Sequence, residues 1–259
     1  DAKDWSLIRQ ELSRRTQSAN WRYLEIKGLA HVVEPSAPSL RYEGHRLDLT
    51  AINDDWLRTC SGSHRRLIRK AEKHDIKVTV STSETDVRTF YDLFCQTRRK
   101  HGAPPQPYKL FESIHRRLIS QNKGWIFTAH CDERALAAAI FLSAGPNRWV
   151  TYRFGASCQP EATPGANHLV MSTAINYFRD RGFAQLDFGR TSTFNDGLNR
   201  FKDGWNARRY PITYHRWRGR DFTPESATDL AGGGQAMIFR HLPIPVAKLT
   251  GRILYRHVA

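Results

Sequence analysis

The sequence predicts an α/β fold in the broad sense that includes α+β, with a mixed and mainly antiparallel sheet flanked by helices. Three apolar runs of strand length follow one another between residues 125 and 157, joined by short turn-forming links. Segments with apolar residues at helical spacing lie before and after these runs. With 259 residues and 40% hydrophobic content, the chain can bury a sizeable core.

The first fifty residues predict one helix and two strands. Apolar residues recur at helical spacing over 4–18, and residues 21–27 alternate as in a strand before Gly28. A proline-containing loop is predicted over 31–40. Alternation around Leu47 and Leu49 predicts a short second strand.

A new domain is predicted to begin near residue 56. Ser61 and Gly62 are cap candidates for a helix that runs to His74, and a strand follows from Ile76. Two more helices are predicted over 89–102 and 110–124. Between them lies Ala-Pro-Pro-Gln-Pro, which is stiff because proline fixes its own backbone and restricts the preceding residue.

The second half of the chain predicts a meander followed by alternating helices and strands. The strands at 125–131, 135–143 and 148–157 are joined by short links, which favours antiparallel pairing. The elements predicted after the meander are a helix at 167–181 closed by Gly182, a strand at 184–189, a short helix around 198–202 and a strand at 211–217.

An internal similarity suggests two related halves. A helix followed by NWRYLEIKG near the start is similar to INYFRDRGFAQLDFG later in the chain. We therefore predict that 1–55 is the C-terminal remnant of a first domain and that 56–220 is a complete domain. The chain starts at Asp1 without an initiator Met, which suggests that an upstream piece is missing. Residues 221–259 form a basic and apolar tail, predicted as a helix packed on the domain, with contact to anionic membrane lipid as the alternative.

Composition narrows the class of protein. The formal charge of +15 exceeds what solubility requires and indicates a polyanionic partner or substrate. The four cysteines match no zinc or redox spacing, so we expect them to be reduced and structural, with a catalytic thiol as the alternative. No apolar run approaches the length needed to span a bilayer. We expect a cytoplasmic protein, with peripheral contact at the cytoplasmic membrane face as an added location.

Five segments carry a resemblance to a known family: RRLIRKAEKHDIKV, TRRKHGAPPQPY, YRFGAS, LDFGRTS and GLNRFKDGW. With the element order, they resemble the FemAB-like branch of the GNAT acyltransferase superfamily over most of 56–217. The resemblance implies the second domain of a tandem pair. It also implies transfer of an aminoacyl or acyl group to an amine, as in family members that add amino acids from aminoacyl-tRNA to a peptidoglycan precursor.

The same resemblance sets the expected co-substrates and partners. The donor would be aminoacyl-tRNA or acyl-CoA, with no tightly bound cofactor and no metal. The acceptor would be a small-molecule or lipid-linked amine in the synthesis of cell-envelope peptidoglycan or polysaccharide, and tRNA is a candidate partner. The oligomeric state stays open.

The pair Phe201 and Lys202 resembles the catalytic pair of the peptidoglycan aminoacyltransferases. Amide formation needs a positive group where the oxyanion develops, and the resemblance gives this role to Lys202. Phe201 would form a wall of the acceptor pocket. The alternatives are a solvated lysine on a short helix and an ordinary core aromatic residue.

Further candidates lie on two strands and at the start of one helix. Asp187 would close its strand, and Gly189 would allow a sharp turn that brings side chains together at the strand end. Asp187 would accept or orient the proton of the amine; its alternative role is an ion pair with Arg190. The predicted substrate-binding residues are Tyr152, Arg153, Arg190, Thr191, Asn195 and Asn167. Tyr152 and Arg153 should point to opposite faces of their strand.

Two basic clusters are candidates for binding phosphate or tRNA. Their members are Arg66, Arg69 and Lys70 on the first helix of the new domain, and Arg98 and Arg99 before the proline-rich segment. The alternative for either cluster is a solvated surface.

The donor-binding loop departs from that of the CoA-dependent enzymes. CQPEATPGANH contains two prolines, which lack N–H groups, and a negative glutamate, which argues against a pyrophosphate site. A CoA-dependent N-acetyltransferase therefore stands as the first alternative function. A non-catalytic RNA-binding protein is the second, because basic and aromatic residues are interspersed.

Overall fold

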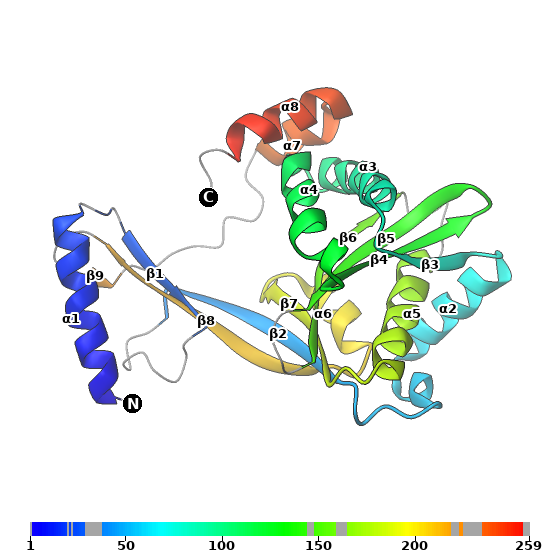
Figure 1. Cartoon of the computed structure of the whole chain (residues 1–259), viewed down its shortest axis with the longest axis horizontal. Coiled ribbons are helices and arrows are strands. Elements are labelled where there is room, and N and C mark those ends of the chain that lie inside the picture. Colours follow the sequence, from blue (N-terminus) through cyan, green and yellow to red (C-terminus); the bar gives the residue numbers. More distant parts are fainter. Residues whose placement is uncertain are drawn as a thin grey trace. The chain divides into compact units, whose positions relative to one another are not determined.

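The computed structural model describes residues 2–19, 21, 23–28, 38–143, 148–158, 165–218, 223–224 and 235–255 (Figure 1). The chain forms two compact units. The first contains Asp1–His45, Arg190–Phe201 and Arg209–Ala231, and the second contains Arg46–Gly189, Lys202–Arg208 and Gly232–Ala259. The division into a remnant at 1–55, a complete domain at 56–220 and a tail at 221–259 stays a prediction.

The second unit holds the predicted sheet and its helices. Its elements are a 3-10 turn at Trp56–Thr59, α2 (Gly62–Lys73), β3 (Lys77–Ser81), α3 (Glu84–Lys100), α4 (Tyr108–Arg117), β4 (Gly124–Cys131), β5 (Arg134–Ser143), β6 (Trp149–Ser157), α5 (Ala166–Asp180), α7 (Gln235–His241) and α8 (Ile244–Leu254). β7 (Gln185–Ser192) and α6 (Asp196–Asp203) belong partly to each unit. Strands β3, β4, β5 and β6 pair antiparallel in succession, and β6 pairs parallel with β7. The predicted mixed, mainly antiparallel sheet is confirmed.

The core of the second unit lies on both faces of this sheet. On one face Phe127, Phe141 and Phe178 are fully buried, with ring centroids 5.2 to 5.6 Å apart. On the other, Phe111 of α4 packs 5.1 Å from Phe154 of β6. Helices α3 and α4 therefore cover one side of the strands and α5 covers the other (Figure 1). Such burial stabilises by roughly 2 kcal/mol for each large apolar side chain.

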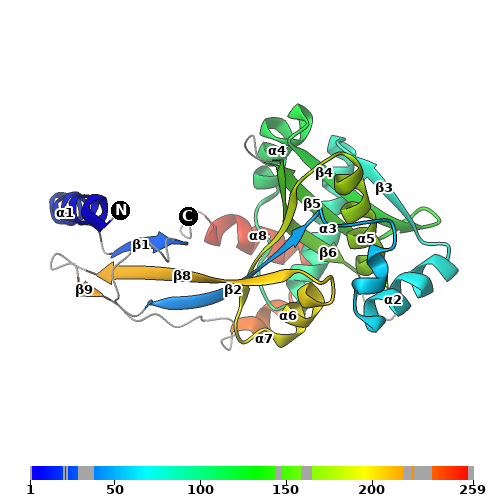
Figure 2. The same ribbon diagram turned by 90° about the horizontal axis from the view of Figure 1, so that it is seen from below.

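The first unit contains α1 (Ala2–Ser18), β1 (Tyr23–Lys27) and β9 (Thr223–Pro224), together with most of β2 (Leu40–Asp48) and of β8 (Arg208–Arg218). Strand β8 lies between β1 and β2, and β1 pairs antiparallel with it from Tyr23↔Arg218 to Lys27↔Tyr214 (Figure 2). Trp217 packs against Leu12, Leu24 and Ile26. Helix α1 and strands β1 and β8 thus share a small core.

Predicted boundaries of several elements were wrong. β2 begins at Leu40, inside the predicted loop, of which residues 31–37 lie outside the described chain. α3 begins at Glu84 because the Ser83 hydroxyl accepts a hydrogen bond from the backbone N–H of Asp86 at 3.1 Å and donates to its carboxylate at 2.6 Å. α4 ends at Arg117, and Asn122 at φ 57° turns the chain into β4.

The helical interpretation of the tail is confirmed by α7 and α8, which both contact α3. At Gly251, a Cβ atom would collide with the carbonyl oxygen of Pro105, so glycine is needed where α8 meets the proline-rich segment. Within the described part of the chain, none of the helices has the length and apolar character that crossing a bilayer requires.

The structure describes all four cysteines. All four are free thiols, and three of them are buried. Burial raises the pKa of the Cys60 thiol to about 11, so it stays protonated at neutral pH. A thiol nucleophile therefore finds no support at this position.

A cluster of two histidines and a tryptophan should make the free energy of unfolding depend on pH. The rings of His64 and His168 lie 4.6 Å apart, and His64 lies 4.6 Å from the buried Trp205. Burial, and then the charge of His64, lowers the pKa of His168 from 6.5 to about 4. The unfolded chain therefore binds a proton more readily than the folded chain between these pH values.

We expect the free energy of unfolding to decrease as the pH falls from 6.5 toward 4, by up to about 3 kcal/mol from His168. Urea unfolding across this range should show a weaker pH dependence in His168→Phe. The matched replacement of exposed His74 should keep the wild-type slope. Identical slopes in both variants would contradict the assignment to His168.

Candidate functional site

The Lys202 side chain lies inside the protein rather than on its surface. Asn195 starts α6 by accepting a hydrogen bond from the Leu198 backbone N–H at 3.0 Å, and this helix carries Lys202 one turn further on. The Lys202 side chain is 2% exposed, and Nζ donates to the Gly189 carbonyl oxygen at 2.8 Å. Burial lowers the pKa of Lys202 to about 8, while the charge of Asp187 acts in the opposite direction. The predicted alternative, a solvated lysine, is wrong.

Strand β7 brings Asp187 and Gly189 to this amine. The Asp187 carboxylate accepts a 2.6 Å hydrogen bond from the Gly189 N–H and forms an ion pair with Arg46, Nε to Oδ2, at 3.0 Å. Gly189 has φ 70°, as its predicted conformational role requires, but the prediction that the strand ends near Asp187 was wrong. β7 continues through this left-handed residue to Ser192.

Strand β6 contributes a bulge beside Gly189. Tyr152 pairs with Phe141 and Phe154 with Ile140, so Arg153 has no partner in the register. A Cβ on Gly189 would lie 3.8 Å from the Tyr152 carbonyl oxygen. The backbones of β6 and β7 are therefore close to each other at this point. In the second unit, β6 and β7 pair over Trp149–Thr151 and Gln185–Asp187, and both strands continue further.

The two candidates on β6 differ in exposure. Tyr152 is half-buried with its hydroxyl against Gly155, where a Cβ would collide with it, and burial raises the pKa of Tyr152 to about 12. Arg153 is exposed, with its guanidinium carbon 5.2 Å from the centroid of the Phe154 ring. Tyr152 is therefore the inward side chain, which alternation along the sequence could not decide.

Other candidate residues belong to the first unit. Arg190 is exposed, donates to the Tyr214 hydroxyl at 2.7 Å and lies 4.5 Å from the centroid of the Tyr42 ring. Thr191 is 2% exposed, and its hydroxyl has no hydrogen-bond partner among the described residues. Phe201 is half-buried. The roles of these residues, and the ion pair between Asp187 and Arg190, stay predictions.

The beginning of α5 holds the last substrate-binding candidate. Asn167 is exposed in its first turn, and Gly165 caps the helix at φ 87°. Residues 159–164 of the loop CQPEATPGANH lie outside the described residues. The prediction that this loop disfavours CoA is therefore not tested by geometry.

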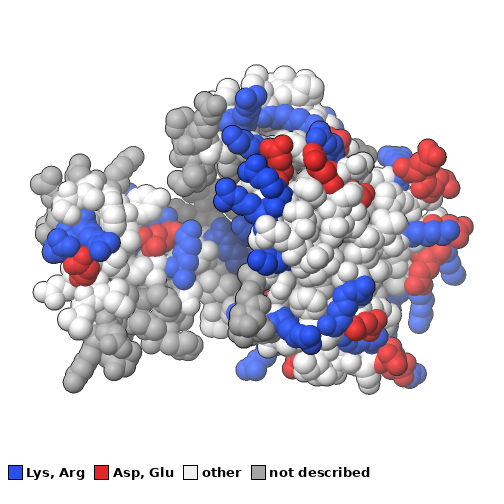
Figure 3. Space-filling view, viewed as in Figure 1, with Lys and Arg blue, Asp and Glu red and all other residues white. Residues whose placement is uncertain are grey.

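The two basic clusters have different surroundings. Arg66, Arg69 and Lys70 are exposed along α2. Arg98 is half-buried and donates to the Pro104 carbonyl oxygen at 3.2 Å and to the Tyr255 hydroxyl at 3.3 Å, which ties α3 to the segments beside it. Arg99 is half-buried. Figure 3 shows Lys and Arg side chains in several separate regions of one face rather than in a single patch.

Sequence reasoning missed Arg46. Its position inside a strand offers no sign that it pairs with Asp187, 141 residues later. Within the described ranges, no three His, Cys, Asp or Glu side chains are grouped so that they could hold a metal ion. The assembled groups are thus an amine, a carboxylate with its guanidinium, and the backbone of two neighbouring strands.

Comparison with known proteins identifies a family model that matches this chain and several solved structures with a similar fold. The family model described as an acetyltransferase (GNAT) domain matches residues 58–203, more than half of the chain. The solved structure of FemX has a TM-score of 0.59 at 15% identity, covering 82% of this chain and 69% of that chain. L-PGS from Bacillus licheniformis has a TM-score of 0.52 at 11% identity, covering 96% and 72%.

A third structure is the C-terminal domain (DUF2156) of a protein from Agrobacterium fabrum assigned as a lysylphosphatidylglycerol synthetase. Its TM-score is 0.50 at 12% identity, covering 80% of this chain and 66% of that one. No curated protein matches the sequence significantly. At these identities the solved structures show the fold alone.

Proposed function

Because the chain belongs to the family of GNAT acetyltransferase domains and is an acyltransferase, we propose that it moves an acyl or aminoacyl group from an activated donor to an amine of a cell-envelope precursor. The observation that carries this proposal is the buried Lys202 amine, which lies against the Gly189 carbonyl and within the field of Asp187. The second alternative function, that of a non-catalytic RNA-binding protein, is inconsistent with an acyltransferase.

In the proposed reaction, the neutral amine nitrogen of the acceptor attacks the carbonyl carbon of the donor thioester or ester. The carbonyl oxygen becomes an oxyanion, and the bond from the carbonyl carbon to sulfur or oxygen then breaks, so the leaving group departs with the electron pair. The nitrogen loses one proton, and the leaving thiol or hydroxyl gains one. No covalent acyl-enzyme is needed.

Each buried group has a role in this scheme. The Lys202 ammonium donates to the Gly189 carbonyl oxygen, and its positive charge can stabilise the oxyanion. Asp187, held by Arg46 and the Gly189 N–H, accepts or orients the amine proton. The bulge on β6 offers backbone groups that can align the donor carbonyl.

The donor has two candidates. The family description names acetyl transfer, which favours acyl-CoA. The FemAB-like segments favour aminoacyl-tRNA through the family that they resemble, and the cell-envelope assignment draws on the same resemblance and on the similarity to the lysylphosphatidylglycerol synthetase domain. Either donor delivers a carbonyl to the same groups.

To test the proposal, the whole chain is incubated with acetyl-CoA or charged tRNA and with small and lipid-linked amines, and the products are identified by mass spectrometry. We expect an amide product with a mass increase equal to the acyl or aminoacyl group. A product that forms from acetyl-CoA and survives RNase identifies CoA as the donor carrier, whereas loss on RNase treatment identifies tRNA. RNA binding without any amide product from either donor would overturn the proposal.

A further inference from the structure

A cavity of about 940 Å³ lies between the proline-rich segment after α3 and helix α8. None of the residues assigned above to acyl transfer or to substrate binding lines it. One wall comes from α8, which lies beyond the residues matched by the family model. Its size is within the range of pockets that hold small organic ligands. The cavity therefore requires an explanation of its own.

Most of the lining of this cavity is apolar. The rings of Tyr91 and Tyr108 lie 5.1 Å apart, and Leu110 and Leu249 face the same space. Leu110 is 40% exposed and Leu249 is 58% exposed, so both leave apolar surface open to a ligand. Such a lining favours a ligand with a hydrocarbon portion.

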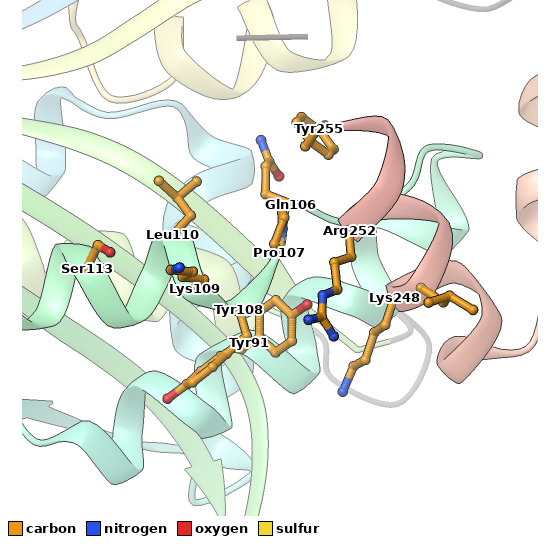
Figure 4. A pocket seen from close by; sticks show the side chains of 11 residues that line it. Tyr91, Gln106, Pro107, Tyr108, Lys109, Leu110, Ser113, Lys248, Arg252 and Tyr255 are labelled. Atoms are coloured by element: carbon orange, nitrogen blue, oxygen red, sulfur yellow. The ribbon is translucent and has the colours of Figure 1, made fainter. Parts of the chain in front are cut away.

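Cations stand at the edge of the apolar lining. Lys248 Nζ lies 5.0 Å from the centroid of the Tyr91 ring and 3.0 Å from the Asp92 carboxylate, and Arg252 is exposed one turn along α8. Figure 4 shows Lys248 and Arg252 extending from this helix toward the two tyrosines. Two buried polar atoms, the Tyr108 hydroxyl and Gln106 Oε1, have no hydrogen-bond partner among the described residues. The ligand should thus also carry negative charge and hydrogen-bonding groups.

The surface around the cavity has the same two properties. Large apolar side chains are exposed on α7 and α8: Met237 at 70%, Ile238 at 65%, Ile253 at 55%, Val246 at 44% and Leu254 at 41%. Residues 235–255 contain three positive side chains, Arg240, Lys248 and Arg252, and no Asp or Glu. Exposed apolar residues beside basic residues on a helix are typical of a membrane-surface segment.

From these contacts we propose that the α8 cavity binds an anionic phospholipid at a membrane surface. One acyl chain lies between Leu110, Leu249 and the tyrosines, and the phosphate meets Arg252 and Lys248, replacing the Asp92 carboxylate. The exposed apolar side chains of α7 and α8 enter the headgroup layer. The proposal is independent of acyl transfer, although it would bring the protein to lipid-linked acceptors.

The test uses the whole chain and sedimentation with vesicles of phosphatidylcholine, with or without about one third phosphatidylglycerol. We expect at least about tenfold stronger partitioning onto the anionic vesicles, because each basic residue near such a surface adds several-fold. K248A/R252A and L249Q/I253Q should each lose about tenfold. The matched control K77A/K123A removes the same charge from two exposed lysines that do not line the cavity, and it should bind as the wild type does.

Several results would overturn the proposal. Equal losses in K248A/R252A and K77A/K123A would indicate unspecific adsorption of a basic protein. Full competition by millimolar glycerol phosphate or inorganic phosphate would indicate a site for a free anion. A wild-type dimer that L249Q/I253Q converts to monomer would indicate a second copy of the chain on this surface. Circular dichroism of each variant shows whether its fold is retained, and L249Q/I253Q provides a second route if K248A/R252A does not fold.

Discussion

Replacement of Lys202 by methionine is expected to lower turnover by about 10²- to 10³-fold with the fold retained, as for loss of a group that stabilises an oxyanion. Methionine fills a similar volume in the site where Lys202 is 2% exposed, but it cannot donate a hydrogen bond. Steady-state amide formation measures the effect, and circular dichroism checks the fold. Unchanged turnover in a folded variant would remove Lys202 from the mechanism.

The protonation of Lys202 gives this result its controls. Because its pKa lies near 8 in the folded protein and at 10.5 in the reference state, the unfolded chain binds more protons between these values. The free energy of unfolding of the wild type should therefore increase as the pH rises from 8 to 10.5, and Lys202→Met should lack this increase. Wild-type turnover should fall as the pH rises through about 8. Exposed Lys77→Met should behave as the wild type in each measurement.

Gly165→Ala is expected to lower the free energy of unfolding by at least about 3 kcal/mol. Two independent costs combine at this position. Gly165 has φ 87°, a conformation that L side chains rarely adopt, and a Cβ there would collide with the carbonyl oxygen of Leu67 on α2. Urea unfolding measures the loss, and slower or absent turnover should follow because α5 packs against β4 and β5.

Two glycines separate these costs. Gly28 has φ 80°, and among the described residues no atom lies within 4 Å of the position that an added Cβ would occupy, so Gly28→Ala should show the conformational cost alone, about 1 kcal/mol. Gly62 begins α2, and an added Cβ there would have its nearest described neighbour, the Arg65 guanidinium, at 3.8 Å. Gly62→Ala should therefore be neutral or slightly stabilising. Equal effects at all three positions would contradict the collision with Leu67.

The architecture could be predicted from the sequence because most of its information is local. Each strand of the meander pairs with the next one along the chain, so short links and apolar runs were sufficient. The amphipathic spacing located α2 and α5. Boundaries failed where a single contact decides them, as at Ser83, whose hydrogen bonds with Asp86 start α3 five residues before the predicted position.

The candidate site could be predicted only in part. The motif around Lys202 singled out a lysine that the structure buries, and Gly189 was correctly expected to have an unusual backbone conformation. The partner of Asp187 could not be found, because Arg46 comes from a strand 141 residues earlier and carries no local signal. The side of β6 that faces inward depends on a bulge, which alternation does not reveal.

The pairing of β1 with β8 has a consequence for how the protein is made. Tyr23 meets Arg218, so β1 leaves the ribosome long before its neighbour has been translated. During that interval its backbone N–H and C=O groups are open to strands of other nascent chains. The charged side chains of Glu25 and Lys27 on this short strand oppose such mispairing while β8 is still untranslated. Once β8 has been made, Arg216 forms an ion pair with Glu25.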